Sequence, residues 1–373
     1  MSTSLRPFAP IAPGEILGEE LQARGWSQND CAAVLGRPVQ AVNEIMTGKK
    51  AITPETAIAL SQALGTSAEY WLNLEAGYRL DLLRQRSGKK TAGVERRSRL
   101  FSKVPLKELM RLGWIKAGLD DLDQAEEAVC RFLEISSIDV GPSMPFAARK
   151  AESFAPHSQA QIAWVCQVRH VAARLRTAKY DRSRFIAAIP GLARLSGSEE
   201  ETRKVPAALA EFGVRFVIVP HLTGTRIDGA TVWLDKESPV VAVSFRYDRM
   251  DWFWFTLMHE LAHVQAGDGL LKAMIDQALV GKDADASALS VVESRADKAA
   301  SAWLAPDDKM KLFIRGTKPY YSRAAILKFA AALGVHPAIV VGQLQNRGEI
   351  PYTHHRGLLV KARHLLATGR IVH

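Results

Sequence analysis

Apolar side chains recur every three or four positions along most of the chain, the spacing that places them on one face of a helix. This pattern runs through residues 13–80 and 105–178 and returns over residues 250–328. Between the last two stretches lie three short runs rich in β-branched residues, at 213–220, 230–234 and 240–245. A small sheet followed by helices is typical of an α+β domain. We therefore predict a mainly helical protein with a small sheet.

The N-terminal helices are short and are separated by residues that end and begin helices. Ser27 is a natural N-cap for a helix that ends at Gly36, and Pro38 favours the first turn of the next helix. Two short helices joined by a tight turn at a glycine form the layout of a helix-turn-helix, whose second helix enters the major groove of DNA. We predict a helix-turn-helix domain of five helices over residues 1–83.

Six polar residues of this domain are candidates for contact with DNA. Amide side chains can pair with adenine, and Lys or Arg side chains can bind backbone phosphates. The candidates are the amides Gln28, Gln40 and Asn43 and the cations Arg37, Lys49 and Lys50. The alternative is a helical bundle that is used only for contact with another protein.

The charge composition of the sequence changes after this domain. The chain has 373 residues and carries 49 Lys and Arg against 39 Asp and Glu, a net charge of +10, which permits contact with a polyanion. Between Arg84 and Arg99 there are seven positive charges and one negative charge, Glu95, with Gly88 and Gly93 interspersed. We predict a basic linker over residues 84–104 that is exposed or faces phosphates. A solvated hinge without a partner is the alternative.

Composition excludes several classes of protein. The chain is 47% hydrophobic and 24% charged, close to the average of globular proteins, which excludes long disorder. Its 3 cysteines lie far apart and form neither a disulfide framework nor a Cys-x-x-Cys metal site. No apolar run approaches the roughly 18 residues of a membrane span, and residues 1–13 lack the pattern of a secretion signal. We expect a cytoplasmic protein without a membrane partner.

One short segment contains the pattern His-Glu-x-x-His, at His259, Glu260 and His263. On a helix, residues four positions apart share a face, so both imidazoles can reach one metal ion. Glu260 lies one residue further round, where a carboxylate can take the proton of a water molecule that the metal activates. The flanking residues 252–257 and 261–264 are apolar around the helix, which predicts a buried element. Buried histidines and a buried carboxylate need partners, and a metal would supply them.

A catalytic zinc site needs a third protein ligand beside an open position. The acidic candidates downstream are Asp268, Asp276 and Glu293. We favour Glu293 because residues 287–304 have the apolar spacing of a helix, on which Glu293 and Asp297 stack one turn apart. Asp297 could then accept a hydrogen bond from a ligand histidine and fix its tautomer. Asp268 directly follows Gly267 and fits better as a turn residue.

Two segments of the N-terminal domain resemble a known family. Residues 48–57 (Gly-Lys-Lys-Ala-Ile-Thr-Pro-Glu-Thr-Ala) and 63–74 (Ala-Leu-Gly-Thr-Ser-Ala-Glu-Tyr-Trp-Leu-Asn-Leu) are similar to signatures of XRE-type helix-turn-helix proteins, and more narrowly of HigA-type antitoxins. The resemblance covers residues 12–80. It departs at Arg37, where the family usually has an apolar residue, and at Val39, where polar residues are usual. The resemblance implies binding to a double-stranded DNA operator, with a homodimer expected for such motifs.

The C-terminal half resembles the ImmA/IrrE family of metallopeptidases, whose zinc sites look like those of thermolysin. The matching residues are the segment 255–263 and then Glu293, Ala296, Asp297, Leu304 and Pro306. The resemblance implies a zincin-like domain over residues 201–373, with His259, His263 and Glu293 as zinc ligands and Glu260 as general base. Two imidazoles and a carboxylate also accept Mn²⁺. Residues 84–200 match only loosely, and we expect a helical connecting region over residues 105–200.

Two functions follow from these observations. The first is a DNA-binding transcriptional regulator that carries a zinc metalloendopeptidase domain, which hydrolyses a peptide bond in a regulatory protein or in the chain itself. The second is a HigA-like antitoxin and autorepressor whose peptidase-like domain binds a toxin or a ligand without proteolysis. Peptide hydrolysis also needs a donor for the oxyanion besides the metal, and Tyr320, Tyr321 and His336 are candidates.

Overall fold

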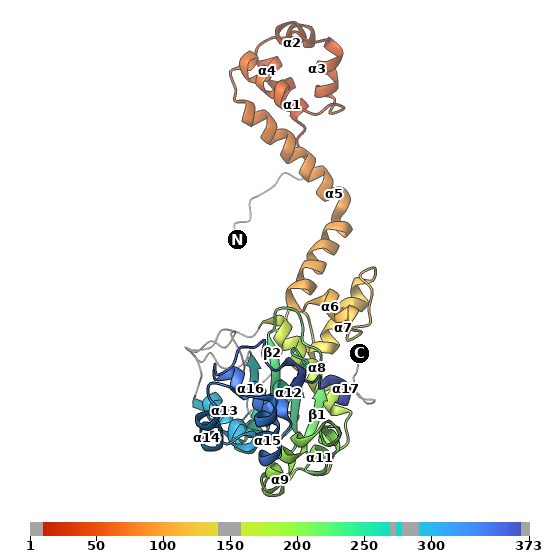
Figure 1. The fold of residues 1–373 in the computed structure, drawn as a ribbon. Helices are drawn as coiled ribbons and strands as arrows, with labels where there is room; N and C mark the ends of the chain where they lie inside the picture. Colours follow the sequence, from red (N-terminus) through yellow and green to blue (C-terminus); the bar gives the residue numbers. More distant parts are fainter. Residues whose placement is uncertain (1–9, 141–157, 269–273, 278–290, 367–373) are drawn as a thin grey trace. The chain divides into compact units, whose positions relative to one another are not determined.

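The computed structural model describes residues 10–140, 158–268, 274–277 and 291–366. The chain divides into two compact units, residues 1–96 and residues 97–373. The division falls within one long helix, α5 (Ala68–Lys103). Helices predominate and a small sheet lies in the second unit, which confirms the predicted mainly helical α+β class (Figure 1).

The first unit contains four short helices and the start of α5, as predicted for the five-helix domain. The short helices are α1 (Pro13–Ala23), α2 (Gln28–Leu35), α3 (Val39–Met46) and α4 (Pro54–Leu64). Ser27 caps α2, because its side chain accepts from the Asp30 backbone N–H while the Asp30 carboxylate accepts from the Ser27 backbone N–H. Gly36 ends α2 with a φ of 61°, the left-handed conformation that glycine adopts without strain. Both predicted helix boundaries are therefore confirmed.

The core of the first unit is small and apolar. Its fully or nearly fully buried side chains are Leu17, Leu21, Cys31, Ala32, Val42, Ile45, Ile52, Ala57, Leu60, Leu64 and Trp71. The Trp71 indole N–H also donates to Thr66 Oγ1 at 2.8 Å, which satisfies its polar atom inside the core. Val34, which the apolar spacing would place inside α2, is 53% exposed.

The stretch predicted as a basic linker, residues 84–104, is helical almost to its end. Helix α5 continues through it to Lys103. The physical reason is that Arg, Lys and Glu are good helix formers, and each of the two glycines costs only about 1 kcal/mol relative to alanine. The high charge of this segment is therefore compatible with a helix. At its end, Leu100 and Val104 are buried in the second unit.

The second unit has a four-stranded sheet surrounded by helices. The strands are β1 (Arg215–Ile218), β2 (Ile227–Trp233), β3 (Pro239–Val243) and β4 (Met274–Gln277), in the order β1-β3-β2-β4. β1 pairs with β3 in parallel, and β2 pairs antiparallel with β3 and with β4. The three predicted strand regions are confirmed, and β4 is an additional strand.

The helices of the second unit precede and follow the strands. Before the sheet come α6 (Leu106–Arg111), α7 (Leu122–Leu133), α8 (Gln159–Ala173), α9 (Arg182–Arg194), α10 (Glu199–Thr202) and α11 (Val205–Glu211). After β3 come α12 (Met250–Ala266), α13 (Val291–Leu304), α14 (Asp307–Thr317), α15 (Arg323–Leu333), α16 (Pro337–Asn346) and α17 (Arg363–Leu366). Short 3₁₀ turns lie at Leu195–Gly197 and Arg356–Leu358.

The two faces of the sheet bury two apolar clusters. Val241 and Val243 of β3 face α12 in one cluster, and Val240 and Ala242 face α7 and α8 in the other. Helix α9 belongs to the first cluster and α8 to the second, so both pack around the same sheet. The predicted boundary at residues 200 and 201 therefore does not separate two packing units, because the sheet needs apolar cover on both faces.

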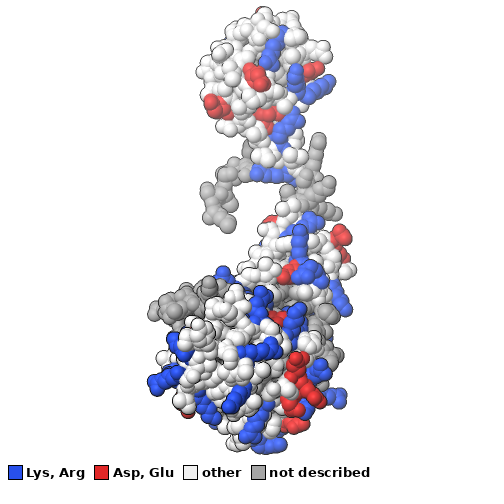
Figure 2. Space-filling model, in the orientation of Figure 1, with Lys and Arg blue, Asp and Glu red and all other residues white. Residues whose placement is uncertain are grey.

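Within the described residues, no single helix is long and apolar enough to cross a membrane. The pair Arg323–Leu333 and Pro337–Asn346 passes that test only together, and it is bent by 110°. On the visible face of the second unit, Lys and Arg side chains are scattered and do not form one continuous patch (Figure 2). The net positive charge of the chain is thus not concentrated on this face.

Candidate functional site

Helix α12 carries the His-Glu-x-x-His pattern through the interior of the second unit. All its residues from Met250 to Val264 are buried except Phe255, which is partly buried, as the apolar flanks predicted. His259, Glu260 and His263 are each 0% exposed. Three polar side chains cannot remain in such a setting without hydrogen-bonding or ionic partners. Their partners come from α13, from β2 and from Asp268, which lies just after the end of α12.

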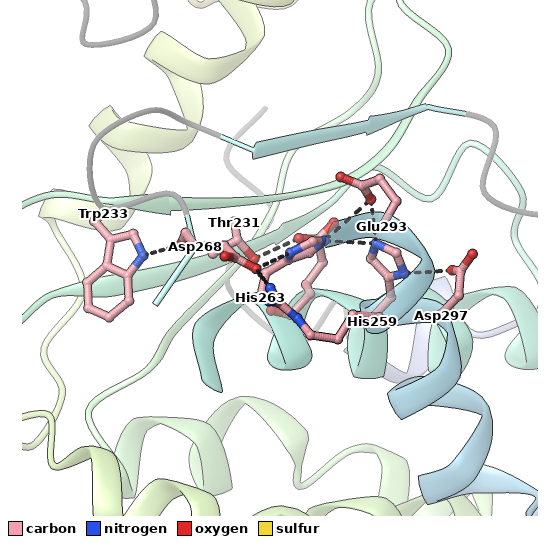
Figure 3. Close-up of polar contacts among 9 residues, drawn as sticks. Thr231, Trp233, His259, His263, Asp268, Glu293 and Asp297 are labelled. Atoms are coloured by element: carbon pink, nitrogen blue, oxygen red, sulfur yellow. Dashed lines mark hydrogen bonds and ion pairs between the residues drawn. The ribbon is translucent and has the colours of Figure 1, made fainter. Parts of the chain in front are cut away.

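Each histidine ring contacts an aspartate through one nitrogen and the other histidine through the second (Figure 3). The Nδ1 atom of His259 lies 2.9 Å from Asp297 Oδ1, and the Nδ1 atom of His263 lies 2.9 Å from Asp268 Oδ2. The two Nε2 atoms are 3.0 Å apart. Glu293 Oε2 lies 3.2 Å from Nε2 of His259 and 3.5 Å from Nε2 of His263.

The proton positions follow from the chemistry of these groups. An ionised carboxylate only accepts hydrogen bonds, so each Nδ1 carries the proton in its contact with an aspartate. A neutral imidazole then presents a lone pair at Nε2. The two Nε2 atoms and the Glu293 carboxylate converge within 4.8 Å of one another, and these three acceptors would repel one another without a cation between them. The donor set therefore fits a divalent metal ion.

Glu293 and Asp297 both project from α13, one turn apart, so the helix predicted over residues 287–304 places them as expected. The described part of this helix begins at Val291, and residues 287–290 lie outside the described residues. Ala296, Ala300 and Leu304 lie on the same face of the helix as Glu293 and Asp297, and this buried face packs on α12. Glu293 remains a half-buried side chain, 19% exposed. Asp276, the other candidate ligand, lies in β4, and its side chain is outside the described residues.

Asp268 lies in the turn after α12, as predicted, and it also contacts the histidine cluster. Gly267 ends α12 with a φ of 78°, and the Asp268 N–H donates back to the His263 carbonyl at 2.9 Å. This reversal of the chain brings the Asp268 carboxylate onto the Nδ1 atom of His263. Arg295 of α13 contacts the same carboxylate oxygen, and the Trp233 indole N–H donates to the Asp268 carbonyl at 2.8 Å. Asp268 therefore contacts the Nδ1 atom of His263 as Asp297 contacts that of His259.

Glu260 is held against β2. The Thr231 hydroxyl contacts Glu260 Oε2 at 2.7 Å and the Glu260 carbonyl at 3.0 Å. Two residues earlier on the same face of the strand, Gly229 lies so close that a Cβ atom there would be 2.4 Å from Glu260 Oε1. Neither residue was predicted, because their approach to α12 depends on strand pairing between segments far apart in the sequence.

The candidate oxyanion donors have other contacts. The Tyr321 hydroxyl donates to Glu349 Oε2 at 2.7 Å, and Tyr320 is 85% exposed. His336 caps α16, because its Nδ1 atom accepts from the Ala338 backbone N–H at 3.1 Å. Within the described residues, no contact joins these side chains to the histidine cluster.

Most of the candidate DNA contacts are exposed side chains, and one of them, Arg37, instead forms a hydrogen bond within the domain. Gln40, Asn43, Lys49 and Lys50 are exposed in or just after α3. The Asn43 amide donates to Gln28 Oε1 at 3.2 Å, which joins α3 to the first residue of α2. Arg37 differs, since its half-buried guanidinium donates to Thr56 Oγ1 at 2.7 Å and ties the turn to α4. Gln40, Asn43 and the two lysines are therefore the exposed candidates, whereas Gln28 is partly buried.

Comparison with known proteins concerns the first unit. The helix-turn-helix family matches residues 17–71. An uncharacterized HTH-type transcriptional regulator of Escherichia coli, YddM, is 34% identical over 90 residues, which are 24% of this chain and 90% of that protein. Virulence-associated protein I of Dichelobacter nodosus is 38% identical over 76 residues, 20% of this chain and 70% of that protein.

Among solved structures, a HigA-family addiction module antidote protein of Coxiella burnetii is 42% identical, covering 22% of this chain and 91% of its own, with a TM-score of 0.22. Pseudomonas aeruginosa antitoxin HigA, solved with the higBA promoter, is 35% identical, covering 22% of this chain and 90% of its own, with a TM-score of 0.22. On the match with the Escherichia coli regulator, the chain belongs to the helix-turn-helix family of transcriptional regulators.

Proposed function

We propose that this protein is a DNA-binding transcriptional regulator whose second unit is a zinc-dependent peptidase acting on a regulatory protein or on the chain itself. The observation that carries the enzymatic half is the convergence of His259, His263 and Glu293 within 4.8 Å, with Glu260 buried on the same helix. Membership of the helix-turn-helix family and the exposed polar side chains of α3 support the DNA-binding half.

The roles of the residues follow from their contacts. His259, His263 and Glu293 would hold Zn²⁺, or Mn²⁺. The ion, when bound, supplies Lewis-acid activation of water and of the scissile carbonyl. Asp297 and Asp268 fix the histidine tautomers. Glu260 takes the proton from the attacking water, and the Thr231 hydroxyl sets the orientation of that carboxylate.

The enzymatic half is tested with the purified full-length chain and two variants. Metal content is measured by mass spectrometry, and cleavage is followed on the chain itself and on a fluorogenic peptide library. His259→Ala should lose the metal, and Glu260→Gln should keep metal and fold but stop cleavage. Equal metal content in the wild type and in His259→Ala would refute the ligand assignment, and unchanged cleavage by Glu260→Gln would refute the role of Glu260.

The DNA-binding half is tested separately by selecting bound duplexes from a random double-stranded pool. Asn43→Ala should relax the selected sequence, whereas Lys49→Ala should weaken binding to all sequences and lessen its dependence on salt. Arg79→Ala, which removes an exposed cation of α5 outside residues 17–71, is the matched control. Failure to enrich any duplex would refute this half. DNA binding with bound metal but without cleavage would instead favour the antitoxin and autorepressor hypothesis, in which the second unit binds a toxin or a ligand.

A further inference from the structure

The second unit contains a large groove away from the histidine cluster. It has a volume of about 680 Å³, within the range of ligand-binding sites. Val171 and Leu175 line it at the end of α8, and Pro206, Ala207 and Ala210 line it on α11. Strand β1 also lines it and contributes Phe216, Val217 and Ile218. The Ala178 N–H donates to the Ala210 carbonyl at 2.9 Å, which joins the two walls.

The strand that lines this groove lies at the edge of the sheet. In the order β1-β3-β2-β4, no strand among the described residues pairs with the outer side of β1. The Val219 N–H donates to the Val243 carbonyl at 3.1 Å, on the side of β3. Because bonding residues alternate along a strand, the backbone N–H and C=O groups of Phe216 and Ile218 point the other way, towards the open edge. Helices α8 and α11 cover opposite faces of the sheet beside it.

The charged side chains of the groove are mainly positive. Arg176 follows α8 and Arg203 precedes α11, and Glu211 is the acidic residue of the lining. Neither guanidinium forms an ion pair within the part of the chain that the structure describes. The neighbouring Glu201 pairs with Lys204. The groove thus combines an open strand edge, apolar walls and two cations at its rim.

We propose that this groove binds an extended peptide segment of a partner protein, one that carries carboxylate side chains and pairs with β1 as an added strand. An added strand would use the backbone groups of Phe216 and Ile218, place its alternate side chains against α8 and α11, and bring its carboxylates to Arg176 and Arg203. A small amphipathic acid would use the walls and the arginines but would leave the strand edge without a partner. The strand edge therefore favours the peptide.

Fluorescence anisotropy with the full-length chain tests this proposal. The probe is a labelled heptapeptide in which glutamate alternates with valine, and two control peptides replace glutamate by lysine or methylate the backbone nitrogens. The acidic peptide should bind, and both controls should bind at least tenfold more weakly. Equal binding of the methylated peptide would overturn strand addition. Displacement of the acidic peptide by decanoate, at a decanoate concentration equal to the Kd of the peptide, would also overturn it in favour of a small-acid site.

Variants of the chain test the location. Loss of one exposed ion pair weakens binding by up to about fivefold, so the double reversal Arg176→Glu and Arg203→Glu should raise the Kd by about tenfold or more. Ala207→Trp, at an exposed position on α11, should block the groove without disturbing the fold. Arg174→Glu, an exposed arginine outside the lining, is the matched control and should leave the Kd unchanged. Binding that is unaffected by Ala207→Trp, or that is reduced equally by Arg174→Glu, would overturn the proposal.

Discussion

The glycine on β2 that faces Glu260 provides the sharpest test of the site. A Cβ atom at Gly229 would lie 2.4 Å from Glu260 Oε1 and 2.7 Å from Thr256 Cγ2. Ordinary contacts between such atoms are about 3.5–4.0 Å, so Gly229→Ala must move β2 and α12 apart by about 1 Å. Inserting a methyl group into a packed interior of this kind costs about 1–3 kcal/mol.

This cost converts into a measurable melting shift. For a domain of about 150–250 residues, each kcal/mol lowers Tm by about 2–4 °C, so Gly229→Ala should melt about 2–12 °C below the wild type. The measurement is thermal unfolding in the presence of a chelator, so that metal binding does not contribute. Cleavage should be lost in the same variant, because the added methyl group displaces the Glu260 carboxylate, while zinc content should persist.

Gly191→Ala is the matched control for this experiment. Gly191 lies inside α9, and a Cβ atom added there would meet nothing within 4 Å, so alanine should stabilise the helix by about 0.5–1 kcal/mol. The two substitutions add the same methyl group, at Gly191 into open space and at Gly229 against packed atoms. A Gly229→Ala protein that has the same Tm as the wild type and still cleaves would refute the close packing of β2 on Glu260.

Three further predictions concern the histidine cluster, the first unit and acid stability. Asp268→Asn should weaken zinc binding by about 10- to 100-fold in competition with a chelating dye, whereas the exposed control Asp235→Asn should not; equal affinities would contradict the orienting role of Asp268. Ser27→Ala should lower the stability of the first unit by about 1 kcal/mol in urea unfolding, and no change would contradict the capping box. Burial lowers the pKa of His336, so the unfolded chain binds the proton more readily and stability falls as the pH drops below about 6.5. His336→Asn, which keeps a capping side chain, should therefore lose less Tm between about pH 7.5 and about pH 5.5 than the wild type, and an equal loss would contradict this account.

Local signals made much of this protein predictable from its sequence. Ser27 and Gly36 mark the ends of α2 through backbone geometry that depends only on neighbouring residues. The spacing of His259 and His263 places two imidazoles on one helix face wherever that helix packs. Glu293 and Asp297 were identified from helical spacing of the same kind, and their contacts with the histidines agree with that interpretation.

The features that the sequence did not predict depend on contacts between distant segments. Thr231 and Gly229 reach Glu260 only because β2 pairs with β3 and packs on α12, which no local pattern encodes. Asp268 looked like an ordinary turn residue because its role requires the left-handed Gly267 to fold it back onto His263. The helical state of the basic stretch 84–104 was not predicted for another reason, since its charges and glycines are typical of a linker and yet Arg, Lys and Glu also favour a helix.

The register in which β2 pairs has a consequence for when the folding chain could become active. Thr231 and Gly229 lie on the same face of the strand, and Ala230 between them faces the opposite cluster. A slip of one residue in the pairing would turn Ala230 towards Glu260 and take the Thr231 hydroxyl away from it. Under the proposed function, a chain with its sheet assembled in the wrong register would thus be unable to hydrolyse peptide bonds, which would guard the cell against stray proteolysis by immature molecules.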